Sequence, residues 1–150
     1  MEETEELSGL IKILLTSQRF AVLATLSEGQ PYSNLVAFAE TDNLRSLLFV
    51  TSRKTHKYSN TLVSKKVALL IDSRTNQTSD FSSAIAITAL GTIDEVAAEN
   101  KDYLSEIYLY KHPELKDFLS NPSSALMKIV VNNYIVATFD SVRRLLIGET

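Results

Sequence analysis

The sequence predicts a mainly β protein, a β-barrel with peripheral helices and about seven strands. From residue 19 to residue 96, short runs rich in Val, Ile, Leu, Phe and Thr alternate with polar turns, as in consecutive strands. Two of these runs, 67–71 and 84–87, are apolar on both faces, so we expect helices or a second subunit to cover the outer face. A closed barrel also removes the exposed edges of so many strands. The length of 150 residues suits one domain over 1–150.

A helix is predicted at the start of the chain, within residues 1–17. Leu7, Leu10, Ile11 and Leu14 repeat at the helical spacing and give one apolar stripe. Five strands follow, at residues 20–26, 32–39, 47–51, 67–72 and 84–95. Short polar loops at 27–30 and 41–43 join the first three strands, which should form an antiparallel meander.

Helices are predicted at two further places. Thr55 is placed to cap a short helix over 55–64, in which Tyr58 and Leu62 lie four residues apart. Residues 97–120 form a helical excursion before the closing strands, with an interruption before Pro113 because proline disfavours helix in the residue that precedes it.

Two closing strands complete the prediction. Residues 126–131 and 134–139 flank Asn132-Asn133, a pair that favours a tight turn. With the five earlier strands they bring the expected total to about seven.

Composition excludes several classes of function. The absence of cysteine excludes disulfides, thiolate metal sites and thiol redox chemistry. A net charge of −3 is too balanced for nucleic acid as the main partner. The acidic N-terminus is unlike a signal peptide, and no apolar run approaches the ~18 residues of a membrane span. We therefore expect a cytoplasmic protein that binds neither nucleic acid nor membrane.

Catalysis by side chains alone is not indicated. His56 and His112 are the two histidines, and neither lies in a recognisable catalytic motif. The acidic residues and histidines make no spaced set of metal ligands, so no metal site is predicted and no catalytic residue is named. Redox chemistry would therefore require a bound cofactor.

The densest polar cluster, residues 51–57, lies where a strand is predicted to end and a helix to begin. Hydroxyls and the basic side chains of Arg53, Lys54 and Lys57 surround the predicted helix start, whose free N–H groups favour an anion such as phosphate. A solvated, charged turn in which Thr55 only caps the helix is the alternative interpretation.

Four segments in order, 31–38, 48–52, 55–62 and 67–72, resemble the pyridoxamine 5′-phosphate oxidase-like flavin-binding proteins. The likeness runs from about residue 20 to residue 96, and residues 134–139 look like the family's closing strand. The resemblance implies a split β-barrel fold, and a homodimer that binds FMN in a groove at the subunit interface.

The resemblance also implies which residues bind the cofactor. The flavin ring and ribityl chain would lie along Ser33, Asn34, Leu35 and Val36, and the phosphate would contact Thr51, Ser52, Thr55, His56 and Lys57. The oxidases carry an arginine on the second strand where this chain has Asn34 or Leu35, and an arginine beside the lysine where it has His56. An exposed residue at the helix start is the alternative interpretation of His56. The sequence also ends without the arginine- and tryptophan-bearing tail of the oxidases, so we do not expect their substrate pocket.

A polar loop at residues 72–81 is a further candidate. In this class of fold it can reach the flavin, where Arg74 would place positive charge near the ring edge and Asn76 would donate a hydrogen bond. The alternative is a surface loop whose Asn and Asp side chains make their own turns.

The leading functional hypothesis is therefore an FMN-dependent oxidoreductase that acts on a small-molecule substrate or electron donor. A non-catalytic flavin-binding or sensing dimer is one alternative. A protein of the same fold that binds F420 or haem is another.

Overall fold

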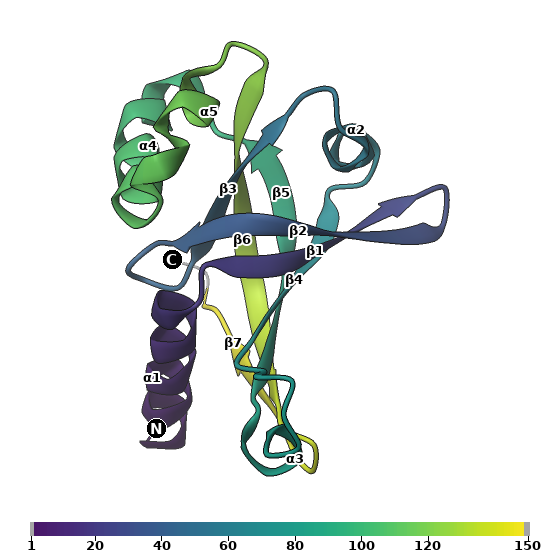
Figure 1. The fold of residues 1–150 in the computed structure, drawn as a ribbon, viewed down its shortest axis with the longest axis vertical. Helices are drawn as coiled ribbons and strands as arrows, with labels where there is room; N and C mark the ends of the chain where they lie inside the picture. The colour runs from purple at the N-terminus through teal and green to yellow at the C-terminus, as the bar shows by residue number, and fades with distance from the viewer. Residues whose placement is uncertain (1, 149–150) are drawn as a thin grey trace.

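The computed structural model describes residues 2–148. Met1, Glu149 and Thr150, which belong to the predicted 1–150 domain, lie outside the described residues. The helices are α1 (Glu2–Ser17), α2 (His56–Val63), α3 (Asp80–Ser83), α4 (Ala98–Lys111), the 3-10 helix η1 (Pro113–Leu115) and α5 (Lys116–Ser120). The strands are β1 (Phe20–Ser27), β2 (Gln30–Glu40), β3 (Ser46–Ser52), β4 (Lys66–Asp72), β5 (Ala86–Glu95), β6 (Ser124–Ala137) and β7 (Val142–Leu146) (Figure 1).

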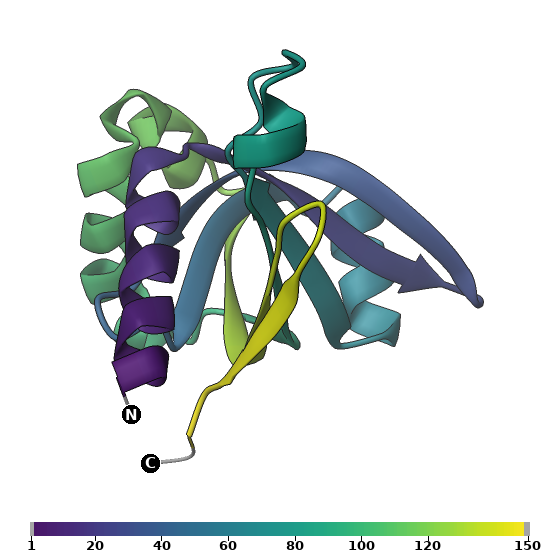
Figure 2. The ribbon, with the colours of Figure 1, turned by 90° about the horizontal axis from the view of Figure 1, so that it is seen from below.

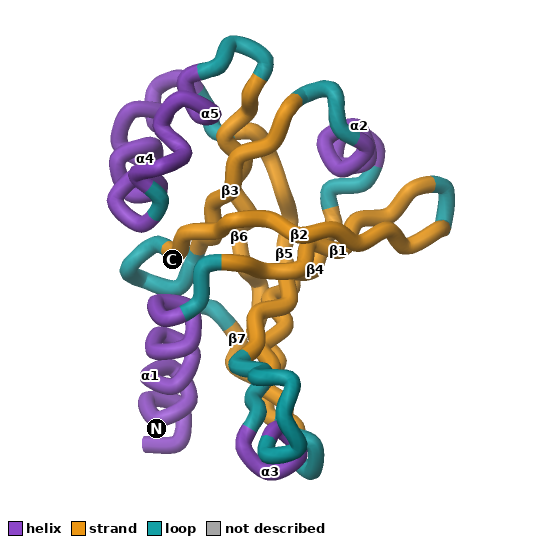
Figure 3. The backbone as a smooth tube through the Cα atoms, viewed as in Figure 1, coloured by secondary structure: helices purple, strands orange, loops and turns teal. Residues whose placement is uncertain are grey.

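The strands close into a barrel. They are ordered β3-β2-β1-β4-β5-β6-β7, and an additional pairing between β3 and β6 joins the ends of the six-stranded part. β7 pairs with the second half of β6, outside this closure. Helices surround the strands (Figure 3), so the predicted β-barrel with peripheral helices is confirmed.

Local sequence explains the first hairpin. Glu28 and Gly29 both have positive φ, at 49° and 79°. Two residues of this conformation match the twist of antiparallel strands, and glycine adopts it without strain. The predicted meander of β1, β2 and β3 is confirmed by the register of their pairing.

The predicted turn at Asn132-Asn133 is wrong. Both residues lie inside β6, which continues from Ser124 to Ala137, and the register against β5 shifts between Leu90 and Gly91. β6 thus carries a bulge, which bends a strand without ending it. A Cβ at Gly91 would lie 2.2 Å from the Val130 carbonyl oxygen, so this close approach requires glycine. The seventh strand is instead β7, which sequence reasoning missed.

Two hydrophobic clusters organise the helices. Inside the barrel, Leu23, Phe38 and Leu69 are fully buried, and α1 adds Ile11 and Leu15 to the same cluster. Figure 2, seen from below, shows α1 and β7 on the near side of the sheet. The second cluster packs α4 and α5 against the outer face of β3 and β6, with members Ala39, Leu48, Val50, Val96, Leu104, Tyr108, Leu119 and Leu126.

The outer face of β1, β4 and β5 is small and mostly apolar. Along each strand, residues of this face alternate with residues of the buried inner face. The side chains of the outer face are half-buried: Val22, Ala24, Ala68, Leu70, Thr88 and Leu90. Within residues 2–148, no helix has the length and apolar character needed to cross a bilayer.

Candidate functional site

A groove lies where β2, the end of β3 and the start of α2 meet the helical excursion. In Figure 1, α2 lies on one side of β3, and α4 and α5 lie on the other. The groove has a volume of 270 Å³ and is lined by Leu35, Val36, Ala37, Val50, Thr51, Ser52, Thr55, Lys57, Tyr108, Leu115 and Phe118. The structure therefore brings six predicted site residues together: Leu35, Val36, Thr51, Ser52, Thr55 and Lys57.

One end of the groove is rich in hydrogen-bond donors. Thr55 caps α2 as predicted, and its Oγ1 accepts from the Tyr58 N–H at 3.2 Å. The Thr51 and Thr55 hydroxyls lie 3.0 Å apart. At the first positions of a helix the N–H groups have no intrahelical acceptor, so those of His56 and Lys57 remain available to a ligand. We call this end, formed by Thr51, Ser52, Thr55, His56 and Lys57, the anion turn. The side chain of Lys54, which was also predicted to add charge here, is exposed and does not line the groove.

Lys57 supplies the positive charge of this end. It is half-buried, and burial lowers the pKa of its ammonium group. In one orientation of the Asn34 amide, both its oxygen and its nitrogen have hydrogen-bond partners. Lys57 Nζ then donates to the Asn34 amide oxygen at 3.1 Å, and the Asn34 amide nitrogen donates to the Leu23 carbonyl oxygen at 3.3 Å. Among the described residues, no carboxylate lies within ion-pair distance of Lys57. Asn34, a predicted site residue, thus positions the lysine.

The other end of the groove is apolar. Leu35 of β2 is 64% exposed and Phe118 of α5 is 40% exposed, although both are large hydrophobic side chains. Tyr108 anchors α4 beside them, because its hydroxyl donates to the Ala37 carbonyl oxygen at 2.8 Å. Burial raises the pKa of Tyr108, so this hydroxyl keeps its proton. Sequence reasoning missed Leu115 and Phe118, since nothing in a short helix indicates which strand it will face.

A buried contact fixes α2 on the barrel. The Asn60 side-chain amide donates to Thr25 Oγ1 at 3.1 Å, and both residues are buried. Asn60 lies in the polar sequence of α2 and Thr25 lies in β1, and neither residue carries a local signal for a partner so distant in the sequence. Neither was predicted.

Ser33 and His56 do not line the groove. Ser33 is exposed on β2, opposite Ala24 of β1. His56 is exposed at the start of α2, with its ring centroid 6.3 Å from that of Tyr32. The side chain of Arg53, predicted to add charge to a phosphate site, is also absent from the groove and pairs with Glu95.

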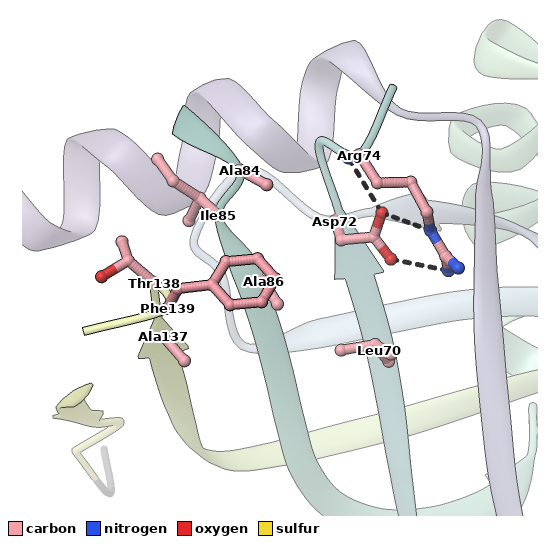
Figure 4. A pocket seen from close by; sticks show the side chains of 9 residues that line it. All are labelled: Leu70, Asp72, Arg74, Ala84, Ile85, Ala86, Ala137, Thr138 and Phe139. Atoms are coloured by element: carbon pink, nitrogen blue, oxygen red, sulfur yellow. Dashed lines mark hydrogen bonds and ion pairs between the residues drawn. The ribbon is translucent and has the colours of Figure 1, made fainter. Parts of the chain in front are cut away.

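Arg74 lies elsewhere within the chain and lines a separate hollow of 340 Å³ (Figure 4). Asn76 follows it in the same loop and lines neither the groove nor this hollow. The Arg74 guanidinium forms a bidentate ion pair with the Asp72 carboxylate, with two contacts of 2.8 Å, and this pairing raises the pKa of Arg74. Asn76 has a φ of 63°, and its N–H donates to the Asp80 carboxylate at 2.8 Å. Within the described chain, Arg74 and Asn76 therefore belong to a surface loop whose Asp side chains accept its backbone N–H groups, the alternative that the sequence left open.

The described residues contain no group of three or more His, Asp or Glu side chains placed to hold a metal ion. The donor set of the groove consists instead of hydroxyls, N–H groups and one ammonium.

The barrel, its closure and its groove define a split β-barrel protein. The family model of the pyridoxamine 5′-phosphate oxidases matches residues 7–134, and the chain belongs to this family. Among curated proteins, none matches the sequence closely enough to count as a relative.

Solved structures show the same fold at low sequence identity. A heme binding protein from Mycobacterium smegmatis matches with a TM-score of 0.79 and 12% identity, over 89% of this chain and 55% of that protein. This chain thus spans little more than half the length of that protein. An FAD-binding protein from Mesorhizobium loti matches with a TM-score of 0.68 and 17% identity, over 86% of this chain and 90% of the other. General Stress Protein 26 from Bacillus anthracis matches with a TM-score of 0.68 and 20% identity, over 97% and 100%.

Proposed function

We propose that the groove binds FMN and that the protein is a flavin-dependent oxidoreductase acting on a small molecule or electron donor. The phosphate lies at the anion turn, and the flavin ring lies along Leu35 and Val36 toward Phe118. One observation carries this proposal: Lys57 is half-buried beside the capped start of α2, and no carboxylate of residues 2–148 pairs with it.

The anion turn suits a phosphate on physical grounds. A cation removed from water is costly unless an opposite charge or hydrogen bonds compensate. A phosphate placed between Lys57 and the N–H groups of His56 and Lys57 would supply that charge. The Thr51 hydroxyl, which lies 3.0 Å from Thr55 Oγ1, would add a further hydrogen bond to the phosphate.

The two-ended groove favours a ligand with an anionic tail and a flat apolar body. FMN has this form, whereas inorganic phosphate would leave Leu35 and Phe118 exposed. The groove of 270 Å³ is smaller than the ~300–1,000 Å³ of sites that bury such ligands, so a second surface is needed to complete it.

A second copy of the chain is the proposed source of that surface. The half-buried, mostly apolar outer face of β1, β4 and β5 is suited to an interface between subunits. In such a homodimer, the loop that carries Arg74 and Asn76 is free to approach the partner's groove. Both residues remain predictions as cofactor contacts.

The bound flavin would supply hydride or electron transfer. The chain's own residues would bind and orient it: the anion turn fixes the phosphate, Leu35 and Phe118 exclude water from the ring, and Tyr108 holds the helical wall in place. No side chain of the groove is assigned a proton-transfer role.

Haem is the second ligand to consider, because one structural neighbour is named a heme binding protein. No histidine lines the groove, and His112 is buried with its Nε2 2.7 Å from the Phe38 carbonyl oxygen. Histidine is the common protein ligand of haem iron, so these contacts favour FMN.

The visible spectrum of the purified protein tests the proposal, recorded before and after addition of FMN and after gel filtration. Flavin absorption that travels with a dimer supports it. A protein that rejects FMN, or that retains haem or F420 instead, overturns it. Turnover with candidate acceptors after reduction then separates an enzyme from a sensor.

A further inference from the structure

Arg53 makes an extensive set of long-range contacts beneath the anion turn. Its backbone N–H donates to the Ser123 carbonyl oxygen at 2.9 Å. One guanidinium nitrogen donates to the Pro122 carbonyl oxygen at 2.9 Å and to that of Ser124 at 2.8 Å, and the other pairs with Glu95. Arg53 therefore fastens the turn to the segment that ends the helical excursion and begins β6.

Glu95 extends this network to α2. While one of its carboxylate oxygens pairs with Arg53, the other accepts a hydrogen bond from the Tyr58 hydroxyl at 3.1 Å. Tyr58 is the residue whose N–H is capped by Thr55. Glu95, at the end of β5, thus links Arg53, which follows Ser52, to Tyr58, which follows Lys57.

The bonds inside the turn are local by comparison. The Thr55 N–H and hydroxyl both donate to the Ser52 carbonyl oxygen, at 3.1 and 2.9 Å, and the Lys54 N–H donates to Ser52 Oγ at 3.2 Å. These bonds set the shape of the turn. The pairing of β3 with β6, which reaches Ser52 and Ser124, and the longer-range contacts of Arg53 together hold the turn in place relative to the helical wall of the groove.

We infer that Arg53 is a positioning residue for phosphate recognition, which acts through Glu95 and Tyr58 and does not itself touch the ligand. The inference rests on the proposed function, because the anion turn is the site that it positions. This positioning role differs from direct binding of the phosphate by the Arg53 guanidinium.

The two roles predict opposite effects of neutralising Glu95. If Arg53 were a phosphate ligand, Glu95→Gln would release its guanidinium and FMN would bind as well or better. If Arg53 positions the turn, the same variant loosens the network and weakens FMN binding. Tyr58→Phe removes only the second arm of Glu95 and provides a milder version of the same perturbation.

The test compares FMN with riboflavin, which lacks the phosphate, in equilibrium titrations of the full chain. Arg53→Met should lower the affinity for FMN by about 10-fold, because misplaced contacts lose much of their strength. Riboflavin affinity should stay within about 2-fold, as should both affinities in Lys54→Met, which removes the same charge from an exposed neighbour. Melting temperatures identify any variant that fails to fold.

Three results overturn the inference: equal losses for FMN and riboflavin, equal losses in Arg53→Met and Lys54→Met, or tighter FMN binding in Glu95→Gln. A wild-type protein that binds no FMN contradicts the proposed function instead. In that case inorganic phosphate is the probe, and the positioning role predicts that it shifts the amide NMR signals of His56 and Lys57 in the wild type and much less in Arg53→Met.

Discussion

Replacement of Lys57 by alanine separates phosphate recognition from the rest of the groove. The lysine is half-buried, faces no carboxylate within residues 2–148, and is held by Asn34 at 3.1 Å. A charge-assisted hydrogen bond to phosphate contributes about 1 to 3 kcal/mol at such a site. Lys57→Ala should therefore raise the Kd for FMN by about 5- to 150-fold.

Quenching of flavin fluorescence measures this effect in parallel titrations with FMN and riboflavin. The account predicts a loss confined to FMN, because riboflavin carries no phosphate for Lys57 to bind. Lys54→Ala is the matched control, since Lys54 is exposed and does not line the groove. An unchanged FMN affinity in Lys57→Ala would refute the reasoning, and so would an equal loss for riboflavin.

Four further outcomes are expected. Burial lowers the pKa of Lys57 below 10.5, and phosphate binding needs the protonated ammonium group. The affinity for FMN should therefore stay constant below that lowered pKa and fall as the pH rises through it. A pH titration in which the riboflavin affinity follows the same curve would contradict this. Thr55→Ala should destabilise α2 by about 1 kcal/mol and weaken FMN binding, as measured by urea unfolding and titration. Gly91→Ala should destabilise the fold by about 1 to 3 kcal/mol, because the new Cβ meets the Val130 carbonyl oxygen; an unchanged urea midpoint would show that β6 yields there. Leu70→Asp should give a monomer in sedimentation, whereas a retained dimer would place the interface elsewhere.

Local sequence patterns were sufficient to predict most strands of the barrel. The first five strands lie close to their predicted ranges, and Thr55 caps α2, because strand composition and capping are properties of neighbouring residues. Asn132-Asn133 shows the limit. The pair has the residues of a tight turn, but its pairing with β5 requires a bulge, and that information lies about forty residues away at Leu90 and Gly91.

β7 had no comparable local signal. Leu145 is the one buried residue of this strand, and two charged residues, Arg143 and Arg144, are adjacent in its sequence. It is a strand because β6 extends beyond the barrel and offers a free edge. Long-range pairing, more than propensity, thus determines this element.

The candidate site divides in the same way. The anion turn was predictable from one continuous segment, and the structure places Thr51, Ser52, Thr55 and Lys57 together. The direction of Arg53 was not predictable, because its partners come from Glu95 and from residues 122–124. The apolar wall of the groove was not predictable either, because Leu115 and Phe118 come from the helical excursion, which is distant from β2 in the sequence.

A crystal structure of the protein grown with FMN tests the central claim most directly. The account predicts the phosphate within hydrogen-bonding distance of Lys57 Nζ and the anion turn, with the flavin ring along Leu35 and Val36 and a second subunit covering it. A flavin that contacts neither Leu35 nor Val36, or a phosphate that faces away from Lys57, would contradict it.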